Sequence, residues 1–72
     1  MALFIVTDGI QGGYLADTVI ECDSLREARE TVEDLIEEYL DDGLEVHGSA
    51  RDLPVLIEDD SLGRIIEITE AE

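Results

Sequence analysis

Residues 24–43 hold the longest regular pattern of apolar and polar positions in the chain. Apolar side chains recur there at three- and four-residue spacing, which predicts one amphipathic helix of about five turns. The apolar stripe consists of Leu25, Ala28, Val32, Leu35, Ile36, Tyr39 and Leu40. Ser24 followed by Glu27 predicts an N-terminal capping box, and Gly43 predicts the C-terminal stop. We expect the rest of the chain to pack against this helix.

The other apolar segments are short and rich in β-branched residues, which is typical of strands. The expected strands are residues 3–6, 14–22, 44–47, 53–58 and 64–69. Turns are expected at the glycine-rich residues 7–13 and at residues 59–63. One helix among strands in the order ββαβββ predicts a single α+β domain over residues 1–72, with the helix packed on a small antiparallel sheet.

The apolar residues of the strands fall on both faces of the expected sheet. The residues expected to meet the helix are Ile5, Val19 or Ile20, Val55 or Leu56, and Ile66 or Ile68. A strand with one solvated face alternates more cleanly than the continuous apolar run at residues 3–6. We therefore expect the second face to be covered either by curling of the sheet or by a partner, including a second copy of the chain in a homodimer.

The chain is strongly acidic. Twenty Asp and Glu residues stand against four Lys and Arg, all of them arginine, and give a formal net charge of −16 at pH 7. This field opposes direct binding to nucleic-acid phosphates and to anionic membranes. It attracts a basic protein surface or a cation instead. With no run of transmembrane length and a single cysteine, which excludes an internal disulfide, we expect a cytoplasmic protein.

No catalytic motif is present in the sequence, so we do not expect an enzyme. His47 is the only histidine, which excludes a site with two histidine ligands, and it is expected to point to solvent from a short strand. Cys22 is expected to be a small buried hydrophobe. The acidic pairs at 41–42 and 59–60 lack the spacing of a calcium loop. We therefore expect only weak cation association, with no resident metal and no cofactor.

The polar side of the expected helix is almost entirely acidic. Its residues are Glu30, Glu33, Asp34, Glu37, Glu38, Asp41 and Asp42. The last turn is acidic although the helix dipole is negative there. Carboxylates three and four positions apart lie about 5–6 Å apart at Cβ, which coarsely imitates a row of phosphates. The alternative is a solvated face that only keeps a small protein in solution.

We interpret this side as a face that docks into the basic, nucleic-acid-binding surface of another protein and blocks it. Asp59 and Asp60 are expected to form a second acidic patch for the same partner. In size and composition the chain resembles phage-encoded DNA-mimic inhibitors, the anti-CRISPR proteins among them. The resemblance covers the overall charge and residues 30–42, and it implies an inhibitor that occupies the nucleic-acid groove of a bacterial defence enzyme.

A second resemblance, over residues 4–40, is to HicB-type antitoxins. The residues that carry it are Gly13, Tyr14, Leu15 and Ala16 in the first hairpin, and Ser24, Leu25, Arg26, Glu27 and Ala28 at the helix start. It implies an antitoxin-like or dimerising module that binds through the uncovered sheet face. A third interpretation is that the acidity is an adaptation to high salt, because extreme halophiles carry surfaces rich in Asp and Glu and poor in lysine. The charge would then say nothing about a partner.

Overall fold

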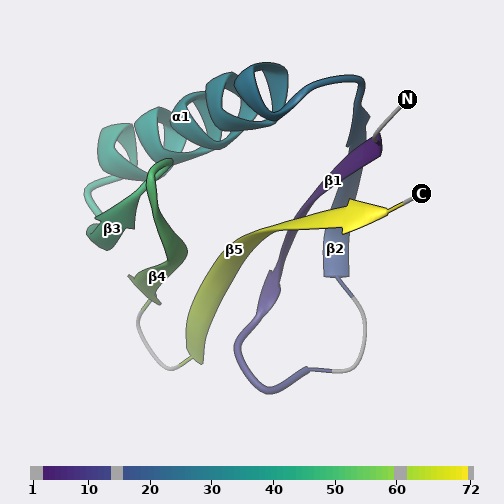
Figure 1. Ribbon diagram of the computed structural model, residues 1–72. Helices are drawn as coiled ribbons and strands as arrows, with labels where there is room; N and C mark the ends of the chain where they lie inside the picture. Colours follow the sequence, from purple (N-terminus) through teal and green to yellow (C-terminus); the bar gives the residue numbers. More distant parts are fainter. Residues whose placement is uncertain (1–2, 14–15, 60–61, 72) are drawn as a thin grey trace.

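The computed structural model describes residues 3–13, 16–59 and 62–71 (Figure 1). Its elements in chain order are β1 (Leu3–Ile10), β2 (Ala16–Cys22), α1 (Leu25–Asp41), β3 (Glu45–Ser49), β4 (Asp52–Asp59) and β5 (Leu62–Ala71). The described residues thus form one helix and one antiparallel sheet. This confirms the predicted α+β class and the predicted order ββαβββ.

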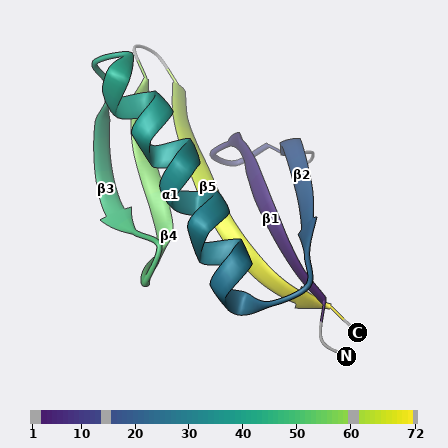
Figure 2. The same cartoon turned by 90° about the horizontal axis from the view of Figure 1, so that it is seen from above.

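The strands lie in the spatial order β2-β1-β5-β4-β3. Two hairpins, β1 with β2 and β3 with β4, form the two sides of the sheet, and β5 lies between them. The helix joins the two edge strands, β2 and β3, and crosses one face of the sheet on its way (Figure 2). Leu3 pairs with Ala71, so the first and last strands run side by side through the middle of the sheet.

Both ends of the helix carry the caps that the sequence predicts. The backbone N–H of Glu27 donates to the Ser24 side chain at 3.2 Å. The Glu27 carboxylate accepts from the backbone N–H of Asp23 at 3.2 Å, so the second bond of the box reaches one residue beyond the cap. At the other end Gly43 has φ of 83°, and its N–H donates to the Leu40 carbonyl at 3.0 Å.

A small apolar core lies between the helix and the sheet. Its buried members are Val6, Cys22, Ala28, Val32, Ala50, Val55, Ile57 and Ile66. Burial of Cys22 confirms the expectation that it acts as a small hydrophobe. Strands β1, β2, β4 and β5 each contribute a buried side chain, and Val46 of β3 packs against the core from the edge. The helix therefore depends on the whole sheet.

One predicted core contact from the strands is wrong by one position, whereas each pair of alternatives predicted for the other strands has a member that packs on the core. Val6, rather than Ile5, faces the helix. Val19 is 60% exposed, whereas Ile20 packs on the core. The physical reason is that both faces of a strand are apolar in a continuous apolar run, so the sequence does not fix which alternate residues face the helix. The expectation that Val55 or Leu56 meets the helix is resolved in favour of Val55, which is fully buried.

The apolar stripe of the helix is shorter than predicted at both ends. Leu40 is 56% exposed, so the stripe ends before it. Leu25, in the first turn, is also exposed. Ala28 and Val32 are fully buried, and Leu35 and Ile36 are partly buried against the core. The core thus meets the middle of the helix, where it crosses the sheet.

The expected turn at residues 7–13 is wrong in part, because β1 continues to Ile10 with a register shift between Asp8 and Gly9. Asp8 lies within the strand and is 3% exposed. It accepts a hydrogen bond from the Tyr39 hydroxyl and lies 3.4 Å from Arg64 Nη2. A polar residue that looks like a turn former is therefore held in a strand by tertiary partners.

Arg64 is the centre of this polar cluster. Its Nε donates to the Tyr39 hydroxyl at 2.9 Å, and its Nη2 donates to Asp17 at 2.7 Å. Burial and the bond to Asp8 raise the pKa of Tyr39 to about 12. The bond to Asp17 raises the pKa of Arg64 further above its ordinary value. The cluster therefore fastens the C-terminal half of α1 to β1, β2 and β5.

The face of the sheet away from the helix remains partly apolar. Ile5, Leu56 and Ile65 are half-buried there, while Val19 is largely exposed. Ile5 pairs with Glu21 of β2 and Thr69 of β5, and Leu56 pairs with Ile65. The twisted sheet thus covers part of this face, and Val19 remains open to solvent.

Candidate functional site

The acidic residues of α1 all lie on its exposed side, as the sequence predicts. We call the following set the acidic helix face: Glu30, Glu33, Asp34, Glu37, Glu38, Asp41 and Asp42. Among the ion pairs of the described residues, one joins this face to an arginine: Arg26 Nε lies 3.6 Å from Glu30 Oε1. Both of those side chains are well exposed, so the pair contributes little stability. Most of the acidic helix face is therefore not neutralised within the described part of the chain.

The second predicted patch is described only in part. Asp60 and the side chain of Asp59 lie outside the described residues. The backbone places Asp59 at the end of β4, next to Glu58, which pairs with Glu45 at the start of β3. Because β3 begins shortly after α1 ends, Asp59 lies at the same end of the fold as Asp41 and Asp42.

An apolar groove runs beside the acidic helix face, between α1 and the β3–β4 turn. Its volume is about 390 Å³, and its apolar lining residues are Ile36, Leu40 and Ala50. Glu37 and Arg51 are among its charged lining residues. The exposure of Leu40, which contradicts its predicted place in the core, follows from this groove. An apolar side chain open to solvent next to a charged face is typical of a protein-binding surface.

The β3–β4 turn is built to approach the helix. Gly48 has φ of 114°, and a Cβ atom there would lie 3.0 Å from the Asp52 carbonyl oxygen. The Ser49 hydroxyl accepts from the backbone N–H of Arg51 at 3.3 Å, which stabilises the turn. Ala50 then packs into the core, and Arg51 lies against the helix.

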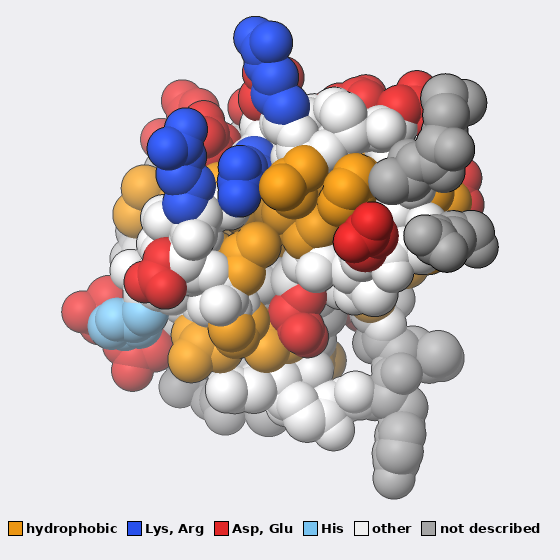
Figure 3. All heavy atoms as spheres, in the orientation of Figure 1, with side chains coloured by type: hydrophobic (Ala, Val, Ile, Leu, Met, Phe, Trp, Pro, Cys, Tyr) orange, Lys and Arg blue, Asp and Glu red, His pale blue; other side chains and the backbone are white. Residues whose placement is uncertain are grey.

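Three of the four arginines gather at this turn. Arg26, Arg29 and Arg51 line a hollow of about 280 Å³ together with Glu30 and Glu33. Figure 3 shows blue basic side chains gathered near the helix and the β3–β4 turn, next to orange apolar ones. Arg26 and Arg29 both lie in the N-terminal half of α1, so the charged residues that the helix itself carries in its C-terminal half are all acidic. Sequence reasoning missed this cluster because Arg51 reaches the helix only through the pairing of β3 with β4.

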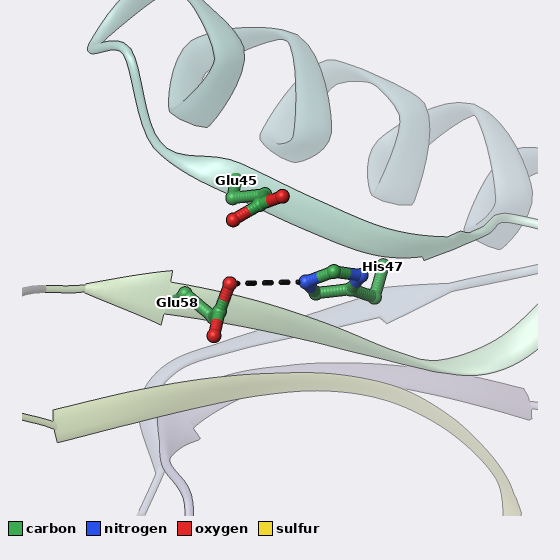
Figure 4. A group of neighbouring side chains, drawn as sticks. All are labelled: Glu45, His47 and Glu58. Atoms are coloured by element: carbon green, nitrogen blue, oxygen red, sulfur yellow. Dashed lines mark hydrogen bonds and ion pairs between the residues drawn. The ribbon is translucent and has the colours of Figure 1, made fainter.

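A different cluster lies on the face of the sheet away from the helix. Glu45 and His47, two positions apart on β3, point to the same side and meet Glu58 of β4 (Figure 4). His47 Nε2 lies 3.2 Å from Glu58 Oε2. One ligand atom from each side chain lies within 4.8 Å of the other two. All three residues are exposed, which confirms that His47 points to solvent.

The two glutamates of this cluster influence each other directly. The hydrogen bond and the repulsion between them raise the pKa of Glu45 above its ordinary value. The hydrogen bond from Glu45, followed by the one from His47, lowers the pKa of Glu58. One histidine and two carboxylates are a ligand set that a divalent metal accepts, although no metal was predicted here. The pattern was missed because Glu58 joins the other two residues only across the hairpin.

In the part of the chain that the structure describes, no helix has the length and apolar character needed to cross a membrane. Comparison with known proteins gives no match to a family model, a curated protein or a solved structure.

Proposed function

We propose that this chain is a small protein-binding inhibitor whose acidic helix face docks on a basic, nucleic-acid-binding surface of a partner and blocks it. The observation that carries the proposal is the exposed, largely unpaired row of carboxylates along α1. The setting would be the cytoplasm, where nucleic-acid-processing enzymes work, and the nearest functional analogy is to DNA-mimic inhibitors of the anti-CRISPR type.

The distribution of charge along the helix supports a partner at its C-terminal half. Arg26, Arg29 and Arg51 offset Glu30 and Glu33 near the N-terminal half. Toward the C-terminus the helix ends without a basic residue in its last turn, although cations are preferred there. Each such misplacement costs about 0.3–1 kcal/mol at low salt. A basic partner removes this cost, so the arrangement favours association over the isolated state.

The apolar groove supplies the short-range apolar contacts of the proposed interface. Long-range attraction from a chain of net charge −16 speeds encounter, but it is screened beyond about 8 Å at physiological salt. Stable interfaces add a desolvated apolar centre within a polar rim. Leu40 and Ile36 provide such a centre beside Glu37. We therefore place the contact on Glu37, Asp41 and the groove next to them.

The test compares two double charge reversals with the same change in net charge. Glu37→Lys/Asp41→Lys alters the acidic helix face, and Glu21→Lys/Glu67→Lys alters exposed positions on the opposite face of the sheet. The assay measures displacement of fluorescent DNA from purified bacterial nucleic-acid-processing enzymes, CRISPR effectors included, by fluorescence anisotropy. We expect the helix variant to lose inhibition and the sheet variant to keep it.

Three results would contradict the proposal. Equal loss in both variants would show that net charge alone acts, without a defined face. Inhibition that is unchanged in molar salt would show that electrostatics is not its basis. Loss in the sheet variant only would favour the rival, a dimerising or antitoxin-like module that uses the open face around Val19, which is 60% exposed. Sedimentation equilibrium of the Val19→Glu variant tests that rival directly.

A further inference from the structure

We infer that Glu45, His47 and Glu58 form a binding site for a first-row divalent cation of the zinc type, with an open coordination position toward solvent. This inference is independent of the proposed docking function, because the site lies on the sheet face opposite α1. The ligand set is one imidazole nitrogen and two carboxylate oxygens.

The hairpin sets the backbone positions of the three ligand residues before any ion binds. Glu45 and His47 are two positions apart on an edge strand, so both side chains leave the same face. Glu58 is the direct cross-strand partner of Glu45. Like charges directly opposite each other destabilise a strand pair unless a proton or a cation lies between them. The register therefore brings two carboxylates together in a place where a cation would be stabilising.

The distances agree with those in a metal site. Ligand atoms bound to zinc at about 2.0–2.2 Å lie about 2.8–3.6 Å apart, given angles between octahedral and tetrahedral values. His47 Nε2 and Glu58 Oε2 are 3.2 Å apart, within that range. Glu45 completes the group within 4.8 Å, a distance that rotation of its exposed side chain can close. Binding therefore requires no movement of the backbone.

The donor types select the class of ion. Magnesium and calcium prefer sites made only of oxygen, and magnesium keeps most of its water. An imidazole nitrogen beside carboxylates suits zinc and its neighbours in the first transition row. Three protein ligands leave the fourth position to water or to a ligand from a second molecule. The negative field of the chain adds diffuse attraction for any cation, so histidine is the residue that makes this site selective.

The test uses untagged protein and zinc in about 0.15 M KCl with excess magnesium, which suppresses diffuse association. Isothermal titration gives the affinity, and NMR of the single histidine ring reports the ligand itself. We expect one zinc ion per chain and a shifted His47 ring signal. His47→Ala and Glu45→Gln/Glu58→Gln should each weaken binding by at least about tenfold.

The matched control is Glu37→Gln/Asp41→Asn, which removes the same charge from the acidic helix face. We expect zinc affinity within about twofold of the unaltered chain. Circular dichroism confirms that each variant is folded, and exposure of all three ligands makes loss of folding unexpected. Zinc affinity that is unchanged in His47→Ala, or lowered equally in the control, would overturn the inference and show diffuse binding to the acidic surface only.

Discussion

Arg64→Ala provides the sharpest test of how the fold is held together. The Arg64 side chain is 19% exposed and lies 3.4 Å from the carboxylate of Asp8, whose own side chain is 4% exposed. Removing the guanidinium leaves a buried carboxylate with Tyr39 as its remaining hydrogen-bond partner among the described side chains. Breaking a buried pair in this way costs about 3–5 kcal/mol. The long contact and the partial exposure of Arg64 place the expected loss near about 3 kcal/mol.

That loss is large for a chain of this size. Domains have about 0.05–0.15 kcal/mol of stability per residue, which gives about 4–11 kcal/mol for 72 residues. The pair of Arg64 with Asp17 adds little, because the Asp17 side chain is 54% exposed. We therefore expect Arg64→Ala to remove about a quarter or more of the free energy of unfolding. Urea unfolding followed by circular dichroism at neutral pH measures this change.

Two controls make the result interpretable. Arg26→Ala breaks an exposed pair with Glu30 and should cost less than about 0.5 kcal/mol. Asp8→Ala/Arg64→Ala removes the buried charge with its partner, so it should be less destabilised than the sum of the two single variants. The reasoning is refuted if Arg64→Ala costs less than about 1 kcal/mol, or if the double-mutant cycle shows no coupling.

Three further predictions follow from the same structure. The pKa of Tyr39 is about 12 in the folded state and about 10 in the unfolded state. The neutral phenol therefore contributes stability fully below pH 10, and this contribution is lost as the pH rises to 12. Tyr39→Phe should make the melting temperature less dependent on pH in this alkaline range. In urea unfolding, Leu35→Ala should lower the free energy of unfolding by about 2–3 kcal/mol, because Leu35 packs against the core. Leu40 is largely exposed, so Leu40→Ala should lower it by less than about 1 kcal/mol. Equal losses would contradict the assigned core. Thermal melts should show a folded chain near about 0.15 M KCl, whereas unfolding there with recovery in molar salt would favour the halophile interpretation.

Local signals explain what the sequence predicted well. Ser24, Glu27 and Gly43 act within a few positions of the helix ends they define, so the boundaries of α1 were accessible without tertiary information. The acidic helix face was equally accessible, because one helix and its C-cap residue carry all of it. The sequence could not predict which face of each strand meets the helix, because the run at residues 3–6 is apolar on both sides. Only packing places Val6, rather than Ile5, against the helix.

The features that the sequence did not predict all depend on pairing between distant segments. Asp8 lies in a strand rather than a turn because Tyr39 and Arg64, far along the chain, satisfy its carboxylate. The hollow with Arg51 and the cluster of Glu45, His47 and Glu58 exist only after β3 pairs with β4. No local periodicity contains that register, so composition and spacing could not reveal these sites.

The place of β5 between the two hairpins has a consequence for folding kinetics. Before β5 is inserted, the β1–β2 and β3–β4 hairpins share no strand contact and are linked through α1. Two-stranded hairpins are marginally stable by themselves in water, so neither can serve as a stable intermediate. The central β1–β5 ladder joins positions from opposite ends of the described chain, which is a high-contact-order event. Formation of the sheet is therefore expected to be a single late, cooperative step. A chain cut before β5 retains only two separate hairpins, and we expect it not to fold.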